Sequence, residues 1–378
     1  MQQYDFVRRL DSSATEKRPN RFHVDIALLI TLLSLCAVGL FVLYSASEQS
    51  MFYVKRQAII MCVGLLGMLA AAQFPVRFWE RWAFFLYIAA ILSLGAVLIF
   101  GVEVKGATRW LNLGITRFQP SEIAKIAVPL MISAYLGKRY IPPSPKHVIT
   151  AFLMVLVPVL AIVRQPDLGT AILVLASGFF VLFLAGLRKR YLITTALAAM
   201  AAVPVLWLYV MRDYQKQRVL TLLSPEDDKF GAGWNIIQST TAIGSGGLRG
   251  KGWTQGTQSQ LNFLPESHTD FIIAVLAEEF GLVGVIVLSV LYLILIGQCM
   301  MIAVNAQSQF GRLIAGSISL TFFIYVFVNM CMVSGILPVV GVPLPLISYG
   351  GTAVVTLFFG FGILMAISTE PRQLRTER

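Results

Sequence analysis

One acidic side chain in the sequence lies where it could act as a base beside a membrane. Asp270 ends the run Pro265-Glu-Ser-His-Thr-Asp270 and directly precedes a long apolar segment. An aspartate at this position could simply cap a helix. Because Ser267 and Thr269 are also available as caps, the sequence favours Asp270 as a catalytic carboxylate that works as a general base. His268 would point elsewhere on a regular helix, so we interpret it as a binding or structural residue.

Two more acids, Glu278 and Glu279, lie inside the apolar segment that follows. From Asp270 to Ala303 this segment would be about 50 Å long as a continuous helix, against a hydrocarbon core of about 30 Å. Either its first turns stand above the bilayer or the helix breaks near Glu278–Gly281. Polar groups at membrane depth face protein or a wet cavity. We therefore predict that both glutamates are structural or line a cavity.

Glu122 and Lys125 form a second candidate site, near the start of another apolar segment. Their spacing of three places both side chains on one helix face, where they can pair. A charge at the centre of a membrane span costs about 2.5–3.5 kcal/mol, so a charged pair there needs a reason. Two interpretations stay open. The pair either fixes helix packing, or Glu122 orients Lys125 as a cation at the mouth of a cavity.

Loops predicted to face outward carry many cations, which suits an anionic ligand. They are Arg109, Arg117, Arg212, Lys216, Arg218, Arg249 and Lys251. The acidic run Glu226–Asp228 could instead neutralise some of them. Since arginine binds pyrophosphate through bidentate contacts, we include Arg249 and Lys251 in a possible pyrophosphate site. The surrounding run Gly244–Trp253 matches neither the P-loop nor the dinucleotide pattern, and its glycines indicate close backbone approach or a flexible lid.

The composition indicates that a membrane positions these residues. Of 378 residues, 57% are hydrophobic and 13% charged, and the mean hydropathy is +0.75. A soluble domain carries about a quarter charged residues. The apolar runs predict an all-α polytopic membrane protein with about ten transmembrane helices. We attribute most of the net charge of +11 to the bias of lysine and arginine toward cytoplasmic loops, not to nucleic-acid binding. The cysteines show neither disulfide nor metal spacing.

The apolar runs divide the chain into two tails, two membrane parts and one large loop. Residues 1–21 form a cytoplasmic tail, 22–211 transmembrane helices 1–7, 212–269 a large periplasmic loop, 270–368 transmembrane helices 8–10, and 369–378 a second cytoplasmic tail. Lysine and arginine cluster in both tails and in the short links after helices 2, 4 and 6, which places these segments and both termini in the cytoplasm. Asp270 then faces outward.

The stretch between helices 9 and 10 is apolar but contains Pro338, Pro343 and Pro345. Three prolines at this spacing exclude a regular helix. The stretch suits a re-entrant segment that lines a lipid-binding groove or contacts a partner, and the alternative is an ordinary buried turn. We predict that Ser348, at its end, and Asp167, in an earlier turn, are structural or cavity-lining residues.

Several motifs resemble those of the shape, elongation, division and sporulation (SEDS) family, and the resemblance covers nearly the whole chain. The longest runs from Asn329 to Ala353 and includes Gly335, Pro338, Gly341 and Ser348-Tyr349-Gly350-Gly351. The others are Arg109-Trp110-Leu111, Phe118–Lys125, Gln165–Gly169 and Leu264–Phe271. Within the family, Gly256–Glu266 and Ala277–Glu279 resemble the rod-shape branch more than the division branch.

This resemblance implies a peptidoglycan glycosyltransferase that polymerises lipid II at the outer face of the bacterial inner membrane during cell elongation. It also implies a class B penicillin-binding protein as the transpeptidase partner, together with other elongation proteins. The family's catalytic aspartate corresponds to Asp270. Its functional arginine, glutamate and lysine correspond to Arg109, Glu122 and Lys125.

The residues and the resemblance together suggest a hypothesis for the reaction. Lys125 and Arg109, with Arg249 or Lys251, would bind the pyrophosphate and stabilise the charge of the leaving undecaprenyl pyrophosphate. Asp270 would take the proton of the acceptor hydroxyl as it attacks the anomeric carbon, which forms a β-1,4 glycan in one inverting displacement. The sequence identifies no cofactor, and it leaves open whether a divalent cation, Mg²⁺ or Mn²⁺, assists.

Other functions account for parts of this pattern. A transporter that flips lipid-linked precursors would also use buried charges and a lipid groove, but the sequence has no convincing internal repeat. A non-catalytic scaffold leaves Asp270 and the outward cations unexplained. A division-type polymerase of the same family is a further alternative.

Overall fold

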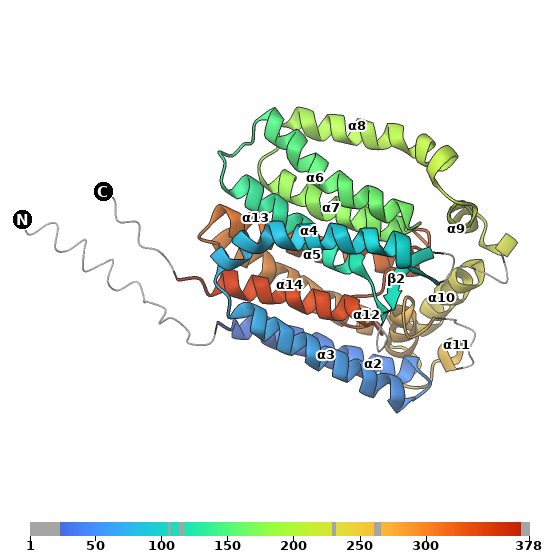
Figure 1. Cartoon of the computed structure of the whole chain (residues 1–378). Helices are drawn as coiled ribbons and strands as arrows, with labels where there is room; N and C mark the ends of the chain where they lie inside the picture. Colours follow the sequence, from blue (N-terminus) through green and yellow to red (C-terminus); the bar gives the residue numbers. More distant parts are fainter. Residues whose placement is uncertain (1–22, 105–106, 113–116, 229–231, 261–265, 372–378) are drawn as a thin grey trace, which may run out of the picture.

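The computed structural model describes residues 23–104, 107–112, 117–228, 232–260 and 266–371, and helices make up most of it (Figure 1). Seven described helices are long and apolar enough to cross a membrane: α2 (Ile26–Ala46), α3 (Met51–Ala72), α4 (Val76–Phe100), α6 (Pro145–Arg164), α8 (Lys189–Val205, continued by a π-helical turn to Val210), α12 (Ile272–Asn305) and α13 (Gln309–Val333). Three shorter helices lie among them: α5 (Pro120–Gly137), α7 (Leu168–Leu184) and α14 (Thr352–Ser368). The predicted helical, polytopic fold is confirmed.

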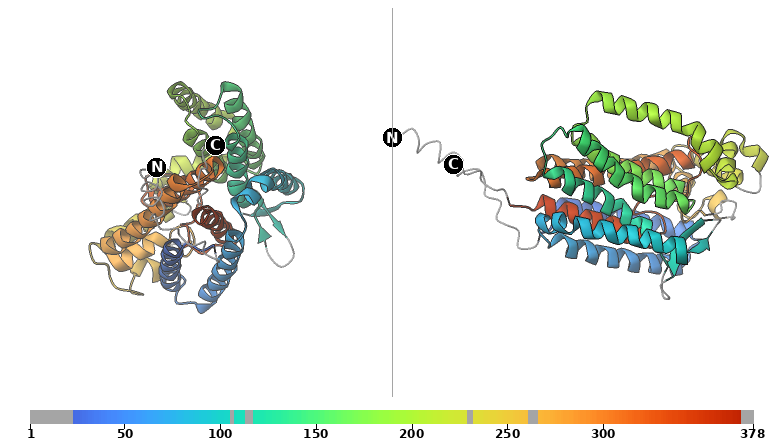
Figure 2. Two further views of the ribbon diagram at one scale, coloured as in Figure 1. Left: turned by 90° about the vertical axis from the view of Figure 1, so that its left-hand side faces the viewer. Right: turned by 45° about the horizontal axis from the view of Figure 1, so that its top comes forward.

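These helices run side by side as one bundle, seen nearly end-on in Figure 2. α14 packs along α3, α13 lies against both α7 and α12, and α5 contacts α4, α7 and α13. By contrast, α8 buries none of its residues and lies at the edge of the bundle (Figure 1). The core therefore surrounds α5, α13 and α14, and this arrangement brings their side chains together.

The first and last described helices meet at one end of the bundle. Ser368 Oγ donates to Asp25 Oδ2 at 2.6 Å, and His23 Nδ1 lies 3.1 Å from Thr369 Oγ1. Asp25 also caps α2 through the backbone N–H groups of residues 27 and 28. The two ends of the chain thus enter the bundle on the same side, as predicted. Which side is cytoplasmic stays a prediction. The predicted tail 1–21 and all but the first three residues of the predicted tail 369–378 lie outside the described residues.

The opposite end of the bundle carries the extramembrane elements (Figure 1). Three short strands, β1 (Val102–Val104), β2 (Ala107–Asn112) and β3 (Arg117–Phe118), form an antiparallel sheet with β2 in the middle. The large loop contains α9 (Asp213–Leu223), a 3₁₀ turn (Pro225–Asp228), α10 (Ala232–Gly246) and α11 (Thr257–Gln260). The sequence predicted a polar loop where the sheet lies. β2 carries Arg109. Its pairing with β1 and β3 fixes the position of this strand.

Helix α12 is broken, and the glycine-rich loop after α10 binds the break. At Gly281 the backbone has φ 64° and ψ −160°, which is not helical. The N–H groups of Lys251 and Gly252 donate to the carbonyls of Glu278 and Glu279, both at 3.0 Å. Beyond the break, the N–H groups of residues 282 and 283 donate to the carbonyls of residues 247 and 248 at 2.9 and 3.2 Å. The loop therefore satisfies backbone groups that a helix break exposes.

This arrangement resolves two alternatives that the sequence left open. The long segment breaks near Gly281 instead of protruding as one straight helix. The glycines permit close backbone approach, because a Cβ on Gly250 would lie 2.1 Å from the Glu279 carbonyl oxygen. Glu278 and Glu279 are buried against protein, as predicted.

The proline-rich stretch between α13 and α14 is a buried loop that lies against the bundle core. Val342, Leu344 and Leu346 are buried in it. Gln57 of α3 is fully buried and holds the end of this loop from both sides, donating to the Ser348 carbonyl and accepting from Gly350 N–H. These contacts support the interpretation as a buried turn.

Candidate active site

Asp270 lies in a turn before α12, at the end of the bundle opposite the described termini. The turn is closed by the N–H of Phe271, which donates to the Glu266 carbonyl at 3.4 Å, and Phe271 is the N-cap of α12. The Asp270 side chain is half-buried, and its Oδ2 lies beside Gly341, where a Cβ would be 3.6 Å away.

A charged pair beside this turn comes from two distant parts of the chain. Arg109 of β2 lies with Nη1 3.5 Å from Asp167 Oδ2. Asp167 also caps α7 through Thr170 and accepts a hydrogen bond from Gln119. The Nε of Arg109 is buried and has no hydrogen-bond partner among the described residues. Arg109 therefore keeps at least one donor that a ligand could use.

Arg218 of α9 was one of the seven outward cations in the sequence, but the sequence did not assign it to the pyrophosphate site. Burial lowers the pKa of its guanidinium below the usual value. Three groups oppose this shift: Tyr214, Asp270 and Asp167. Arg109 adds to it. Contacts agree with this: Arg218 donates to the loop that passes beside Asp270, and Arg109 pairs with Asp167.

Local sequence could have indicated that Arg218 faces inward. Tyr214 and Arg218 are four apart on a short helix, so they share one face. The Arg218 guanidinium lies 5.7 Å from the centroid of the Tyr214 ring, and the Tyr214 hydroxyl donates to the Pro166 carbonyl at 2.5 Å. Arg218 Nη1 donates to the Val339 carbonyl at 3.1 Å. The sequence does not predict where α9 packs on the bundle.

Glu122 and Lys125 form a buried ion pair on α5. Lys125 Nζ lies 2.6 Å from Glu122 Oε1, and their side chains are only 9% and 7% exposed. The Lys125 ammonium also lies 4.8 Å from the ring centroid of Tyr325 on α13. The predicted pairing is present, and an aromatic ring on a second helix holds the cation.

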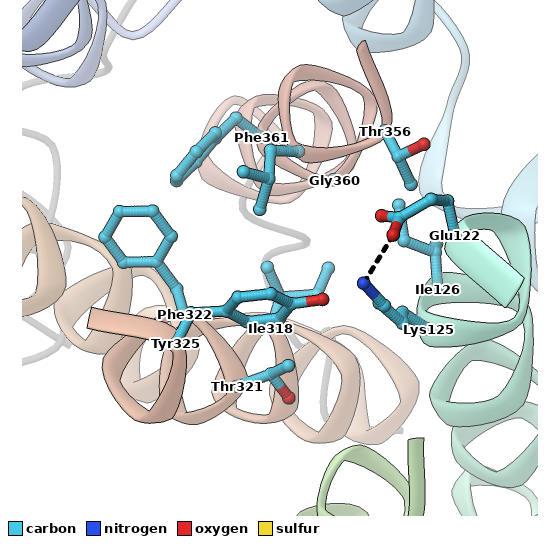
Figure 3. A pocket seen from close by; sticks show the side chains of 11 residues that line it. Glu122, Lys125, Ile126, Ile318, Thr321, Phe322, Tyr325, Thr356, Gly360 and Phe361 are labelled. Atoms are coloured by element: carbon cyan, nitrogen blue, oxygen red, sulfur yellow. Dashed lines mark hydrogen bonds and ion pairs between the residues drawn. The ribbon is translucent and has the colours of Figure 1, made fainter. Parts of the chain in front are cut away.

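A cavity between α5, α13 and α14 adjoins this pair (Figure 3). Its wall includes Glu122, Lys125, Thr321, Tyr325 and Thr356. It offers about 40 Å³ to the centres of water molecules, which is more than one water needs. The buried Thr321 hydroxyl has no hydrogen-bond partner among the described residues. The ion pair therefore lines a cavity whose wall is otherwise mostly apolar, and its role in orienting Lys125 for a ligand stays a prediction.

Lys251 and Glu278 lie together beside the break in α12. Lys251 Nζ is 2.7 Å from Glu278 Oε1, and the same oxygen accepts from the Thr257 hydroxyl and from Gln258 N–H. Glu279 accepts from the Ser45 hydroxyl and from Thr254 N–H. Both glutamates thus make the contacts of structural residues.

Two other predicted ligands of lipid II, Arg249 and His268, have different surroundings. Arg249 is exposed. His268 lies between two aromatic rings, 5.1 Å from Tyr53 and 6.1 Å from Tyr349, and its carbonyl accepts from Tyr349 N–H. The Ser348 hydroxyl accepts from Leu344 N–H inside the buried loop, which is a structural contact. Roles of Arg249, Lys251 and His268 in binding lipid II stay predictions.

The described residues contain no group of three His, Cys, Asp or Glu side chains placed to hold a metal ion. Mg²⁺ often binds through one or two carboxylates plus substrate phosphates. Asp167 and Asp270 would be the carboxylates available to such an ion near Arg109 and Arg218. The use of a divalent cation stays a prediction.

These features define a polytopic helical membrane protein with a charged site at one end of its bundle. Residues 25–373 match the family model of the FtsW, RodA and SpoVE cell cycle proteins, so the chain belongs to that family. It is 54% identical to the peptidoglycan glycosyltransferase MrdB of Escherichia coli K12, over 94% of this chain and 96% of that protein. It is 38% identical to the probable peptidoglycan glycosyltransferase FtsW of Geobacter sulfurreducens, over 92% and 95%.

Solved structures agree with this assignment. A structure described as a peptidoglycan synthase complex that coordinates polymerization and crosslinking matches with a TM-score of 0.81 and 31% identity, over 92% of this chain and 98% of that chain. The crystal structure of Thermus thermophilus RodA matches with a TM-score of 0.72 and 29% identity, over 94% and 100%. The predicted membership of the SEDS family is confirmed, and the higher identity to MrdB than to FtsW favours the rod-shape branch.

Proposed function

We propose that this chain polymerises lipid II into β-1,4 glycan strands during cell elongation, with Asp270 as the general base. The enzyme class is that of its relatives, peptidoglycan glycosyltransferase. One observation carries the assignment of the site. A half-buried aspartate lies in one neighbourhood with two arginines that come from β2 and α9, at one end of a membrane-embedded bundle.

The reaction requires a base on one side of the anomeric carbon and cations on the other. Asp270 removes the proton of the acceptor hydroxyl while that oxygen forms the new bond to the anomeric carbon. The bond from this carbon to the pyrophosphate breaks in the same step, and the leaving group takes the electron pair. One displacement inverts the anomeric centre and needs no covalent intermediate.

Arg109, Arg218 and Lys125 are the cations suited to the departing pyrophosphate. Arg109 has a buried Nε without a partner among the described residues, and a guanidinium can contact a phosphate with two N–H groups. Glu122 fixes the Lys125 ammonium, and Asp167 holds Arg109 from the other side. Cations fixed before the reaction stabilise the developing negative charge without reorganisation.

The partner and the sidedness are also part of the proposal. A class B penicillin-binding protein would supply the transpeptidase, which agrees with a structural neighbour described as coordinating polymerization and crosslinking. The protein would be a multi-pass protein of the bacterial inner membrane, with Asp270 on the periplasmic side. The distribution of lysine and arginine among the links supports this orientation.

The test uses the purified full-length chain, its transpeptidase partner and lipid II. The variant Asp270→Ala should yield no polymer while its thermal stability stays near that of the wild type. Asp213→Asn is a matched control, because Asp213 is an exposed acid at the start of α9. Near-normal polymer from Asp270→Ala would overturn the assignment of the base.

A further inference from the structure

Asn329 is a buried side chain of α13 that reaches the turn containing Asp270. It is fully buried, and its Nδ2 donates to the Asp270 carbonyl at 2.9 Å and to the Val342 carbonyl at 2.7 Å. Both N–H groups of the amide are used, so its orientation is fixed. Its Oδ1 has no hydrogen-bond partner among the described residues. A buried oxygen without a partner costs about 1–3 kcal/mol. The two hydrogen bonds that the amide donates are therefore its contribution to the structure.

The second acceptor belongs to the loop that also binds Arg218. Val342 lies three residues after Val339, whose carbonyl accepts from Arg218 Nη1 at 3.1 Å. Between them, Gly341 lies beside the Asp270 carboxylate. Its φ of 79° suits glycine, so this backbone can pass close to the acid. One amide thus joins the turn of Asp270 to the loop against which Arg218 is held.

We propose that Asn329 is a positioning residue of the transferase site, whose amide fixes the Asp270 carboxylate relative to the Arg218 guanidinium. The inference rests on the proposed function of Asp270 as the base. Asn329 acts through two backbone carbonyls and does not touch the substrate. A displacement of a catalytic group by 1 Å can cost about 100-fold in rate, so this contact matters for turnover.

The charges around Asp270 give the inference a distinctive consequence. The loop that passes beside the Asp270 carboxylate also holds the Arg218 guanidinium. Arg109 and Asp167, which form an ion pair, act in turn on Arg218. A nearby cation lowers the pKa of a carboxyl group. If the turn loosens and Asp270 moves away from Arg218, the pKa of the carboxyl rises. Because a base works only when ionised, the acid limb of the pH–rate profile then moves to higher pH.

Two substitutions of Asn329 test this in the full-length chain with its transpeptidase partner and purified lipid II. Asn329→Leu keeps a similar volume and removes both donors, while Asn329→Asp keeps the shape and replaces the donating nitrogen. For each, kcat, KM and the pH profile are measured per folded protein. We expect kcat to fall about 100-fold with little change in KM, and the acid limb to move upward in both. The leucine variant separates this shift from the effect of an added carboxylate.

Ser317→Ala is the matched control. Ser317 is a fully buried residue of the same helix, and its hydroxyl donates to the Ser177 carbonyl at 2.7 Å. It lies about 18 Å from Asn329 along the helix axis. Its loss should lower thermal stability and leave the pH profile unchanged.

The possible outcomes separate the two proposals. If both Asn329 variants keep the wild-type kcat and pH profile, or lose activity equally at all pH values as a merely unstable protein would, the inference is wrong. Asp270→Ala in the same assay tests the proposed function by itself. Normal polymer from that variant rejects the base, whatever the Asn329 variants do.

Discussion

Asp270 and Glu278 are acids of one short segment, yet their surroundings differ. Glu278 is fully buried, and one of its oxygens accepts from Lys251, Thr257 and Gln258. Asp270 is half-buried, and its backbone carbonyl accepts a hydrogen bond from the Asn329 side chain. The nearby cation, Arg218, is bound to a different loop.

This difference separates an acid that holds the fold from one that can do chemistry. A carboxylate with several short donors at one oxygen is stabilised as an anion and is a poor proton acceptor. The half-buried carboxylate of Asp270 stays accessible to a substrate hydroxyl, which a general base requires. Residue type alone does not distinguish the two acids. Their exposure to a substrate does.

The largest expected effect concerns the acid that does chemistry. Asp270→Asn keeps the shape of the side chain and removes its basicity, so polymerisation should fall by about 10²–10⁴-fold. The midpoint of thermal unfolding should stay close to that of the wild type, because the backbone contact with Asn329 remains. The measurements are polymer length from lipid II and unfolding in detergent. Loss of folding with retained specific activity would reverse the roles assigned to the two acids.

The next effect concerns the acid that holds the fold. Glu278→Ala removes the acceptor of three donors and leaves the Lys251 ammonium without its ion-pair partner. Removing one member of a buried pair costs about 3–5 kcal/mol of unfolding free energy. Glu278→Gln is the matched control, because the amide oxygen of glutamine can still accept hydrogen bonds. The loss of unfolding free energy should therefore be smaller for this variant. Equal stability of Glu278→Ala and the wild type would argue against a structural role.

How far the sequence predicts this molecule depends on the distance over which each contact acts. The helices follow from apolar runs of membrane length. The length of the segment after Asp270 predicted either a break or a protruding helix, and the structure has the break near Gly281. Asp270 and the Glu122–Lys125 pair follow from local position and spacing. Arg218 does not, because its role depends on where α9 rests over the bundle.

The pairing of Lys251 with Glu278 was also beyond sequence analysis. It joins residues 27 apart through a loop that folds back on a broken helix. From the pattern of charges we predicted that Lys251 binds an anionic ligand, because no acidic residue close to it in the sequence indicated Glu278 as its partner. The fixed place of Arg109 on a small sheet was missed for a similar reason, as short strands with few apolar residues resemble a polar loop.

A smaller effect is expected where the glycine-rich loop binds the break. Gly281→Ala places a Cβ 2.4 Å from Gly250 N at a φ of 64°, so either the loop or the helix must shift. We expect a loss of about 1–3 kcal/mol in unfolding free energy from this strain. Gly297→Ala on the same helix is the control, because nothing lies within 4 Å of a Cβ there. Similar unfolding midpoints for the two variants would show that the break tolerates a side chain.

The smallest effect separates the two roles open to Lys251. Lys251→Met keeps much of the stem and removes the charge, but Glu278 retains its hydrogen bonds from Thr257 and Gln258. Glu278 loses its cation but keeps these two donors, and a buried carboxyl group can also take up a proton, so we expect a smaller loss than for Glu278→Ala, about 1–2 kcal/mol in unfolding free energy. If Lys251 only holds Glu278 at the break in α12, the KM for lipid II is unchanged. A KM raised by about tenfold, equivalent to about 1.4 kcal/mol of binding free energy, would instead place Lys251 on the pyrophosphate and extend the site to the broken helix.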